Sequence, residues 1–205
     1  MNRREASRNE TNRLILNAAR ELFSMKGMED CTIRDIAIKA GVSPASVLVH
    51  FKSKTLLLEA ALNNDIEKEL VRLITSMPDT GNPVGLHGQL MHMFTGFLKL
   101  YDSNRDLYRA LLRTTLFEPI QETPRLAGQS EEFLRQLSGM IEERKAAGII
   151  MQEVDSMSAA SSIFFLYMGA LITLFRYTGS TVEQVADFLS GMLSNYIQGI
   201  SRRSV

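Results

Sequence analysis

The sequence predicts an all-α protein, and three observations carry that prediction. Apolar residues recur with helical spacing along nearly the whole 205-residue chain, and no long stretch alternates as a β-strand does. Serine or threonine precedes several of the apolar runs, as helix N-caps do, and glycine follows several of them. These signals divide the chain into nine expected helices, with no internal repeat and no low-complexity tract.

The first 53 residues predict three helices joined by short turns. The first helix is expected over residues 7–26, with a capping box formed by Ser7 and Glu10 and a stop at Gly27. The second is expected to open at Thr32 and to end at Gly41. The third opens with a serine cap followed by proline, which suits the first helical position because its missing N–H costs nothing there.

The remainder predicts six longer helices. Ser53 caps the first of them, and the composition of residues 78–85 predicts a loop. Two prolines break the pattern over residues 118–128, and Gly148 and Gly179 mark later stops. The expected helices span residues 54–77, 86–102, 105–117, 130–147, 155–177 and 181–200.

Charge is distributed unevenly although the formal net charge is zero. Residues 1–55 hold ten Lys or Arg against six Asp or Glu, whereas the rest holds thirteen against seventeen. A basic front and an acidic back indicate two functions, of which the first faces a polyanion.

The second and third helices have the spacing of a helix-turn-helix. Two helices that cross steeply need a small residue, a turn residue that tolerates positive φ and a buried apolar residue; Ala37, Gly41 and Val47 fill these positions. Ile33 and Ile36 belong to the buried face. Such a unit presents its second helix to the major groove of DNA.

Residues 9–58 resemble the N-terminal domain of the TetR family of bacterial repressors. The resemblance lies in the run TIRDIAIKAGVS from Thr32, in Val47, Phe51, Lys54 and Leu57 after it, and in AARELFSMKG before it. It implies a DNA-binding domain over residues 1–53 and an effector-binding and dimerisation domain over residues 54–205. It also implies a homodimer that binds a palindromic operator in double-stranded DNA and releases it when a small molecule binds.

The resemblance implies phosphate contacts from Thr32, Ser43 and Lys54. It places residues 44–46 and 48–50 toward the bases or the adjoining backbone. Together with the lysines and arginine that can displace counterions, the predicted DNA-binding residues are Thr32, Arg34, Ser43, Pro44, Ala45, Ser46, Leu48, Val49, His50, Lys52 and Lys54.

The third helix departs from the family pattern at two positions. An aromatic residue is usual where this chain has Leu48, and a polar or ring side chain is common where it has Val49. With few donors on this helix, apolar contact with thymine methyl groups is the expected mode of base reading. The alternative is that both side chains pack on a neighbouring helix. Arg3, Arg4 and Arg8 form either an arm that reaches DNA or a solvated tail.

The back half is rich in apolar and aromatic residues. Most of them are ordinary core, but methionine and aromatic side chains also suit an adaptable cavity. His92 and Arg176 are further polar groups that could orient a ligand. The sequence predicts a mostly apolar effector. The predicted ligand-binding residues are Phe94, Phe97, Leu98, Tyr101, Tyr108, Leu112, Met140, Phe164, Tyr167, Met168 and Leu171.

The last helix pair is apolar almost all round and therefore needs cover on more than one side, for which a second subunit is the expected source. No apolar run reaches the length of a membrane span, and residues 1–10 do not form a signal peptide. Cys31, the only cysteine, has no internal disulfide partner, and both facts fit the cytoplasm.

No metal, cofactor or catalytic group is expected. His87 and His92 have the wrong spacing for two ligands on one helical face, and no phosphate-binding glycine loop or nucleophile–base pair is evident. The sequence therefore predicts a ligand-responsive transcriptional repressor rather than an enzyme. The alternative is a DNA-binding protein of the same fold that responds to a protein partner.

Overall fold

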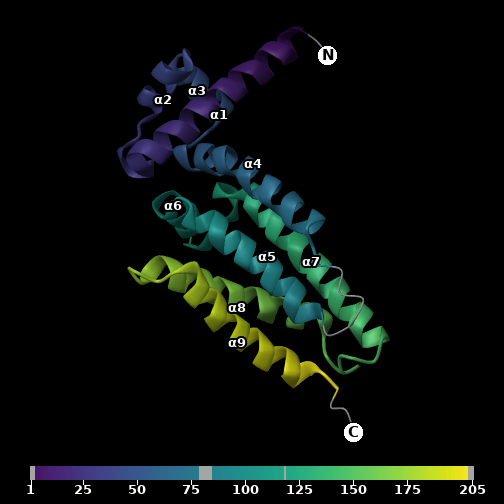
Figure 1. The fold of residues 1–205 in the computed structure, drawn as a ribbon. Helices are drawn as coiled ribbons and strands as arrows, with labels where there is room; N and C mark the ends of the chain where they lie inside the picture. Colours follow the sequence, from purple (N-terminus) through teal and green to yellow (C-terminus); the bar gives the residue numbers. More distant parts are fainter. Residues whose placement is uncertain (1–2, 79–84, 118, 203–205) are drawn as a thin grey trace. The chain divides into compact units, whose positions relative to one another are not determined.

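The computed structural model describes residues 3–78, 85–117 and 119–202, and their fold is all-α, as predicted (Figure 1). Most of the expected loop at residues 78–85 lies outside the described residues. One isolated β-bridge joins Ile150 and Ser201. In the described part of the chain the helices are α1 (Arg3–Asp30), α2 (Ile33–Ala40), α3 (Pro44–His50), α4 (Lys54–Thr75), α5 (Gly85–Asp102), α6 (Arg105–Phe117), the short 3-10 helix η1 (Ile120–Glu122), α7 (Pro124–Ala146), α8 (Ser156–Arg176) and α9 (Val182–Ile200).

The chain divides into two compact units. The first takes the chain up to Glu67 together with Asn104–Ala127, and the second takes Lys68–Ser103 together with the chain from Gly128 onward. The helix α4 therefore contributes its first part to one unit and its last two turns to the other. The DNA-binding segment expected over residues 1–53 lies wholly within the first unit.

In the first unit, α1 packs against α2 and α6, and α2 packs against α3. The start predicted for α1 at Ser7 is wrong, because the helix already begins at Arg3 and the Ser7 carbonyl accepts a hydrogen bond from the Thr11 hydroxyl. The predicted interruption is confirmed at Gly27, whose φ of 79° breaks the helical path before one further turn. A glycine adopts this angle without the strain that a Cβ would add.

The caps of the two short helices are confirmed. The Thr32 hydroxyl accepts a hydrogen bond from the Asp35 backbone N–H, and the Asp35 carboxylate accepts one from the Thr32 backbone N–H. Gly41 ends α2 in the left-handed conformation, with φ at 68°. The Ser43 hydroxyl then accepts from the Ser46 N–H at the start of α3. These local contacts set both ends of the turn without help from distant parts of the chain.

Glu59 of α4 joins two distant segments of the first unit. Its side chain is fully buried, and its Oε1 accepts hydrogen bonds from the backbone N–H groups of Arg125 and Leu126, at 2.7 and 3.0 Å. These N–H groups belong to the first turn of α7, where helical N–H groups lack partners of their own. The Arg125 guanidinium lies 3.5 Å from the other carboxylate oxygen. A buried carboxylate thus caps α7.

The beginning predicted for α7 is wrong. The sequence indicates a break over residues 118–128 and a helix from residue 130, whereas α7 begins at Pro124. Proline fits the first helical position, so the second proline of the segment starts the helix instead of interrupting it.

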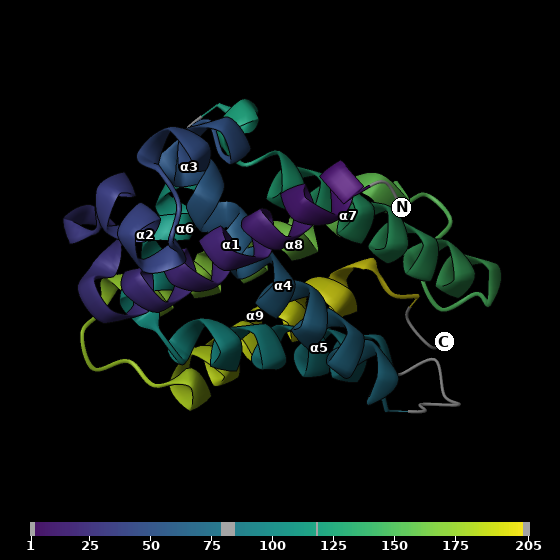
Figure 2. The same ribbon diagram turned by 90° about the horizontal axis from the view of Figure 1, so that it is seen from above.

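In the second unit, α5, α8 and α9 pack against one another, and Figures 1 and 2 both draw α5 beside α9. The end of α4 also lies close to α5. A Cβ placed on Gly96 would lie only 2.3 Å from Cδ2 of Leu73, and His92 Nε2 lies 3.1 Å from the Leu73 carbonyl oxygen. The absence of a side chain at Gly96 therefore allows this close approach.

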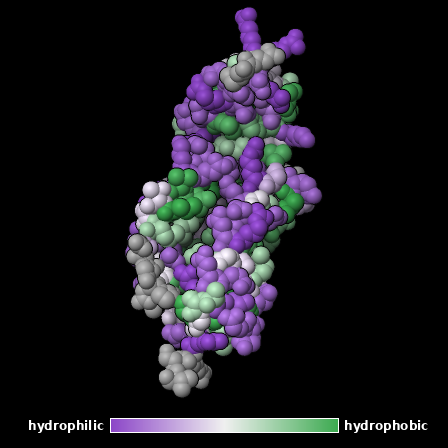
Figure 3. Space-filling view, turned by 90° about the vertical axis from the view of Figure 1, so that its right-hand side faces the viewer, coloured by the Kyte–Doolittle hydropathy of each residue, from purple (hydrophilic) through white to green (hydrophobic). Residues whose placement is uncertain are grey.

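Several large apolar side chains are exposed in both units. The face drawn in Figure 3 is largely hydrophilic, with separate hydrophobic patches. One described helix, α8, is long and apolar enough to cross a membrane. Eight of its residues, among them Ile163, Ala170 and Leu174, are buried inside the unit, as in the core helix of a folded domain.

Candidate DNA interface and aromatic cluster

The outer face of α3 is apolar and open to solvent. Val49 is 78% exposed and Leu48 is 47% exposed, and Pro44 and Ala45 are exposed beside them. The alternative interpretation expects Val49 to pack on a neighbouring helix, and this exposure contradicts it. The described residues of the first unit leave most of Val49 and about half of Leu48 open to solvent, so this face is available to a partner.

The opposite side of the same turn is fixed in the core. Val47 and Ala37 are both fully buried, and Phe51 follows them at the end of α3. The Phe51 backbone N–H donates to the Val47 carbonyl and closes the helix. This arrangement holds α3 rigidly while its outer face stays exposed.

The two hydroxyls predicted to bind phosphate, those of Ser43 and Thr32, differ in whether their protons are free to form a hydrogen bond. The Ser43 hydroxyl is exposed and accepts the Ser46 N–H, and its own proton remains available to a phosphate. The Thr32 hydroxyl both accepts from the Asp35 N–H and donates to the Asp35 carboxylate. A phosphate contact from Thr32 would have to replace that second bond.

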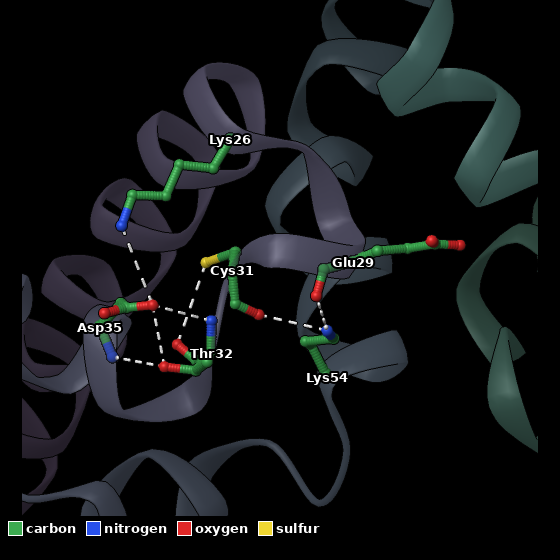
Figure 4. A network of polar contacts seen from close by, with 6 residues as sticks. All are labelled: Lys26, Glu29, Cys31, Thr32, Asp35 and Lys54. Carbon is green, nitrogen blue, oxygen red and sulfur yellow. Dashed lines mark hydrogen bonds and ion pairs between the residues drawn. The ribbon is translucent and has the colours of Figure 1, made fainter.

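Lys54 is engaged in the structure of its own unit (Figure 4). Its ammonium donates to the carbonyl oxygens of Cys31 and Glu29, at 3.1 and 3.3 Å, at the end of α1. Two of its three donors therefore satisfy carbonyls that a helix terminus leaves unpaired. The thiol of Cys31 is buried against the same turn, and this burial raises its pKa, which keeps it protonated and unreactive.

The other predicted basic residues lie at the surface. Arg34 and Lys52 are exposed, and His50 is half-buried at the end of α3 with its ring 6.4 Å from that of Phe51. Arg4 and Arg8 are helical, because α1 includes them, so they do not form an unstructured arm.

Aromatic rings from three helices meet in the second unit. The rings of Phe94 on α5 and Tyr167 on α8 are stacked, with centroids 4.4 Å apart and planes 9° apart. Phe133 on α7 lies with its centroid 6.0 Å from Phe94 and 6.0 Å from Phe164. We call these four residues the aromatic cluster.

Two tyrosine hydroxyls lie within or beside the aromatic cluster. Burial raises the pKa of Tyr101 to about 12 and that of Tyr167 well above its ordinary value, and each hydroxyl also affects the pKa of the other. A hydrogen bond between the two hydroxyls contributes to both shifts: it raises the pKa of Tyr167 and lowers that of Tyr101. Both phenols stay protonated at neutral pH and can act as donors.

The predicted ligand-binding residues do not form one group. Phe94, Phe164 and Tyr167 belong to the aromatic cluster. The ring centroid of Phe97 lies 6.2 Å from that of Tyr101. In the same unit, Leu98 and Leu171 are buried, and Met140 and Met168 are half-buried. Tyr108 and Leu112 belong to the first unit.

The sequence interpretation missed Phe133. Its helix carries the spacing Phe133, Leu137, Met140 and Ile141, which marks one apolar face of α7, and Leu137 and Ile141 are indeed buried. The signal that could have found it is therefore present. Glu59 was also missed, since an acidic residue in an amphipathic helix ordinarily faces solvent.

Comparison with known proteins gives matches at two levels. Residues 15–61 match the family "Bacterial regulatory proteins, tetR family". A curated relative, the HTH-type transcriptional regulator UidR of Escherichia coli, is 40% identical over 58 residues, which are 28% of this chain and 30% of UidR. The match thus spans less than a third of that relative's length.

Two solved structures share the fold over most of the chain. The transcriptional regulator FadR of Bacillus subtilis, solved in complex with stearoyl-CoA, gives a TM-score of 0.70 at 17% identity over 91% of this chain and 98% of FadR. NalD of Pseudomonas aeruginosa, the secondary repressor of the MexAB-OprM multidrug efflux pump, gives a TM-score of 0.63 at 21% identity over 98% of this chain and 100% of NalD. By sequence, residues 15–61 form a helix-turn-helix segment of the TetR family of bacterial regulators, and the chain shares the all-α architecture of these two solved regulators.

Proposed function

We propose that the protein is a dimeric transcriptional repressor that binds a palindromic DNA operator through α3 and releases it when a small molecule binds the second unit. The observation that carries the DNA-binding part is the outer face of α3, where Val49, Leu48 and Ala45 are exposed on a helix whose other side is locked into the core. Ser43 lies at the N-terminus of α3, where it suits a phosphate contact.

The proposed dimer uses α8 and α9. Phe165 and Ile172 on α8 and Phe188 on α9 are exposed although large and apolar. Gly169 and Gly191 lie on the same two helices, and a side chain added at either would meet nothing within 4 Å. A second copy would cover these apolar side chains and use the glycines for close approach of the helices, in an interface where both subunits contribute the same face.

The proposed effector site is in the second unit. Structural relatives support a small-molecule effector: FadR of Bacillus subtilis was solved with stearoyl-CoA, and NalD represses a multidrug efflux pump. The helix α4 is the proposed connection, because it begins beside the helix-turn-helix at Lys54 and its last turns contact α5 through Leu73. An effector that favours another placement of α4 would move α3 and release the operator.

The alternative effector is a protein partner that acts on the same fold. Thermal unfolding with a panel of apolar compounds separates the two, since a bound small molecule raises the melting temperature and a protein-controlled regulator responds to none. The curated relatives are named as transcriptional regulators, so the enzyme alternative receives no support from them. A cytoplasmic location follows from the proposed function.

The test of DNA binding is selection of bound duplexes from a random pool by the full-length protein. The expected result is a palindrome whose half-sites lie about 34 Å apart, one helical turn or a small multiple of it. The matched control is the variant Val49→Asp, which keeps the buried Val47 side of α3 intact and places a negative charge on the outer face. Recovery of the same sequences by the variant, or no enriched sequence with the natural chain, would contradict the proposal.

A further inference from the structure

The first turns of α1 lie outside the core of the first unit. None of the residues 3–14 is buried, and Ile15 is the first buried side chain of the helix. Figures 1 and 2 both draw the purple start of α1 extending beyond α2 and α3. At 1.5 Å per residue this stretch is about 18 Å long. It also precedes residues 15–61, which match the family, so the family match does not account for it.

The sequence of this stretch does little to stabilise a helix. Arg3 and Arg4 stand in its first turn, where the positive end of the helix dipole repels a cation. Four further residues are weak helix formers: Ser7, Asn9, Thr11 and Asn12. A polyanion bound at this end would offset the repulsion between the dipole and the arginines.

Positive charge is in excess along the same stretch. The Arg13 guanidinium donates two hydrogen bonds to the Glu10 carboxylate, at 2.9 and 2.6 Å, so these two charges cancel. The other charges of the stretch are three arginines and Glu5. Arg4 and Arg8 are both exposed, and because they are four residues apart they share one face of the helix. This face is suited to an anionic partner.

The composition of the stretch indicates which anionic partner it fits. From Arg3 to Arg13 the only apolar residue is Ala6. A helix that lies on a membrane needs a broad apolar face, and the core of a protein interface is apolar and aromatic. Contacts with DNA phosphates are instead made by arginine, serine, threonine and asparagine side chains, the types that dominate here. The same unit carries the helix-turn-helix, so the fitting partner is the DNA backbone.

We infer that Arg4 and Arg8 bind backbone phosphates that flank the half-site contacted by α3, so that α1 forms a second part of the DNA interface that is independent of sequence. This inference rests on the proposed function and adds a contact surface to it. A stretch of about 18 Å corresponds to about five base pairs at 3.4 Å each. A duplex that ends at the palindrome therefore lacks the phosphates that this surface would bind.

The experiment compares two duplexes that contain the selected palindrome, with the full-length protein. One duplex ends at the last selected base pair, and the other continues for about eight base pairs of unrelated sequence at each end, which exceeds the reach of α1. Affinity is measured by fluorescence anisotropy at several salt concentrations. We expect the natural chain to bind the longer duplex about 10-fold or more tightly at low salt, with a slope steeper by about one unit for each added phosphate contact.

The double variant Arg4→Gln/Arg8→Gln should reduce the advantage of the longer duplex to less than about 3-fold and flatten its salt slope, because the charges that displace counterions are lost. Its melting temperature without DNA should be unchanged, since both side chains are exposed. Arg8→Lys should keep most of the advantage, because a phosphate contact needs the charge. The matched control is Arg13→Gln, in the same stretch but paired with Glu10, which should preserve the full advantage.

Three results would overturn the inference: equal affinity of the natural chain for the two duplexes, the same loss in Arg13→Gln as in the double variant, or a double variant with a lowered melting temperature and an unchanged duplex preference. Binding to phosphatidylglycerol vesicles that the double variant loses, with DNA affinity unchanged, would assign the surface to a membrane instead. A protein that selects a palindrome but binds both duplexes equally retains the proposed function and loses this contact. A protein that selects no sequence loses both.

Discussion

Val49 in the first unit and Tyr167 in the second depart from the ordinary burial pattern in opposite directions. Val49 is a large apolar side chain on an exposed face, and Tyr167 carries a polar hydroxyl into an aromatic interior, beside the hydroxyl of Tyr101. Exposed apolar groups and buried polar groups are the informative exceptions in a folded protein. The comparison teaches that the exposed apolar group is open to a partner outside the chain, whereas the buried polar group has its neighbour within the same unit.

Glu59 is a second buried polar residue, and it sharpens this comparison most strongly. Glu59 is fully buried, and its Oε1 accepts hydrogen bonds from two backbone N–H groups at the start of α7. Glu59→Ala should lower the free energy of unfolding by about 2–4 kcal/mol, because two helix N–H groups lose their acceptor and a cavity remains. Urea unfolding measures this loss.

The control for Glu59 is Glu67→Ala on the same helix. Glu67 is exposed and accepts one hydrogen bond from Asn63, so its removal should change the free energy of unfolding by no more than about 0.5 kcal/mol. Equal effects at the two positions would mean that the burial of Glu59 and its two hydrogen bonds contribute nothing to stability.

The second unit allows a close approach of helices that a single methyl group should disturb. A Cβ on Gly96 would lie 2.3 Å from Leu73, so Gly96→Ala should cost about 1–3 kcal/mol of unfolding free energy through overpacking. Gly139→Ala is the matched control, since Gly139 is helical and open to space and should gain up to about 1 kcal/mol. A thermal unfolding experiment that gave both variants the same sign would contradict this packing.

Lys52 and Lys54 of the first unit differ in their expected roles: Lys52 should affect DNA binding alone, whereas Lys54 should also affect stability. Lys52 is exposed, so Lys52→Gln should leave stability unchanged. For the natural dimer we expect a slope of log affinity against log salt of about −4 to −7, and the variant should flatten it by about one unit per subunit. Lys54→Gln should also lower the melting temperature, because its ammonium holds the carbonyls of Cys31 and Glu29. Identical stability of the two variants would show that the structural role of Lys54 is negligible.

The smallest expected effect is a pH dependence at Asp35. The backbone N–H and hydroxyl of Thr32 hydrogen-bond the carboxylate and lower the pKa of Asp35 in the folded state. Its contribution is therefore present above the unfolded-state pKa and is lost as the pH falls through the lower folded-state value. The stability difference between the natural chain and Asp35→Asn, measured by urea unfolding, should shrink from pH 6 to pH 2, and a difference that grew would contradict this sign.

The parts of the fold that could be predicted are those set by neighbours in sequence. The Thr32 and Ser43 caps and the Gly41 turn depend on contacts three to five residues long, and the sequence predicts them correctly. The start of α7 at Pro124 could not be predicted in the same way. Its first N–H groups are capped by Glu59, which lies 66 positions earlier in the chain.

The candidate sites follow the same division. The exposure of Val49 follows from the helix-turn-helix pattern, because Val47 fixes which side of α3 is buried. The aromatic surroundings of Tyr167 do not follow from any pattern, since they depend on how α5, α7 and α8 bring Phe94, Phe133 and Phe164 together. The sequence provides the aromatic residues but not their grouping.

The central claim is that the exposed apolar face of α3 reads thymine methyl groups, and replacement of thymine by uracil in the selected operator tests it most directly. The substitution removes one methyl group and leaves every hydrogen-bonding edge unchanged. We expect uracil at one or more operator positions to weaken binding by the natural chain, and the penalty at one such position to shrink in Val49→Ala. Unchanged affinity with uracil at every position, together with loss of specificity in His50→Ala alone, would contradict apolar reading and assign it to His50.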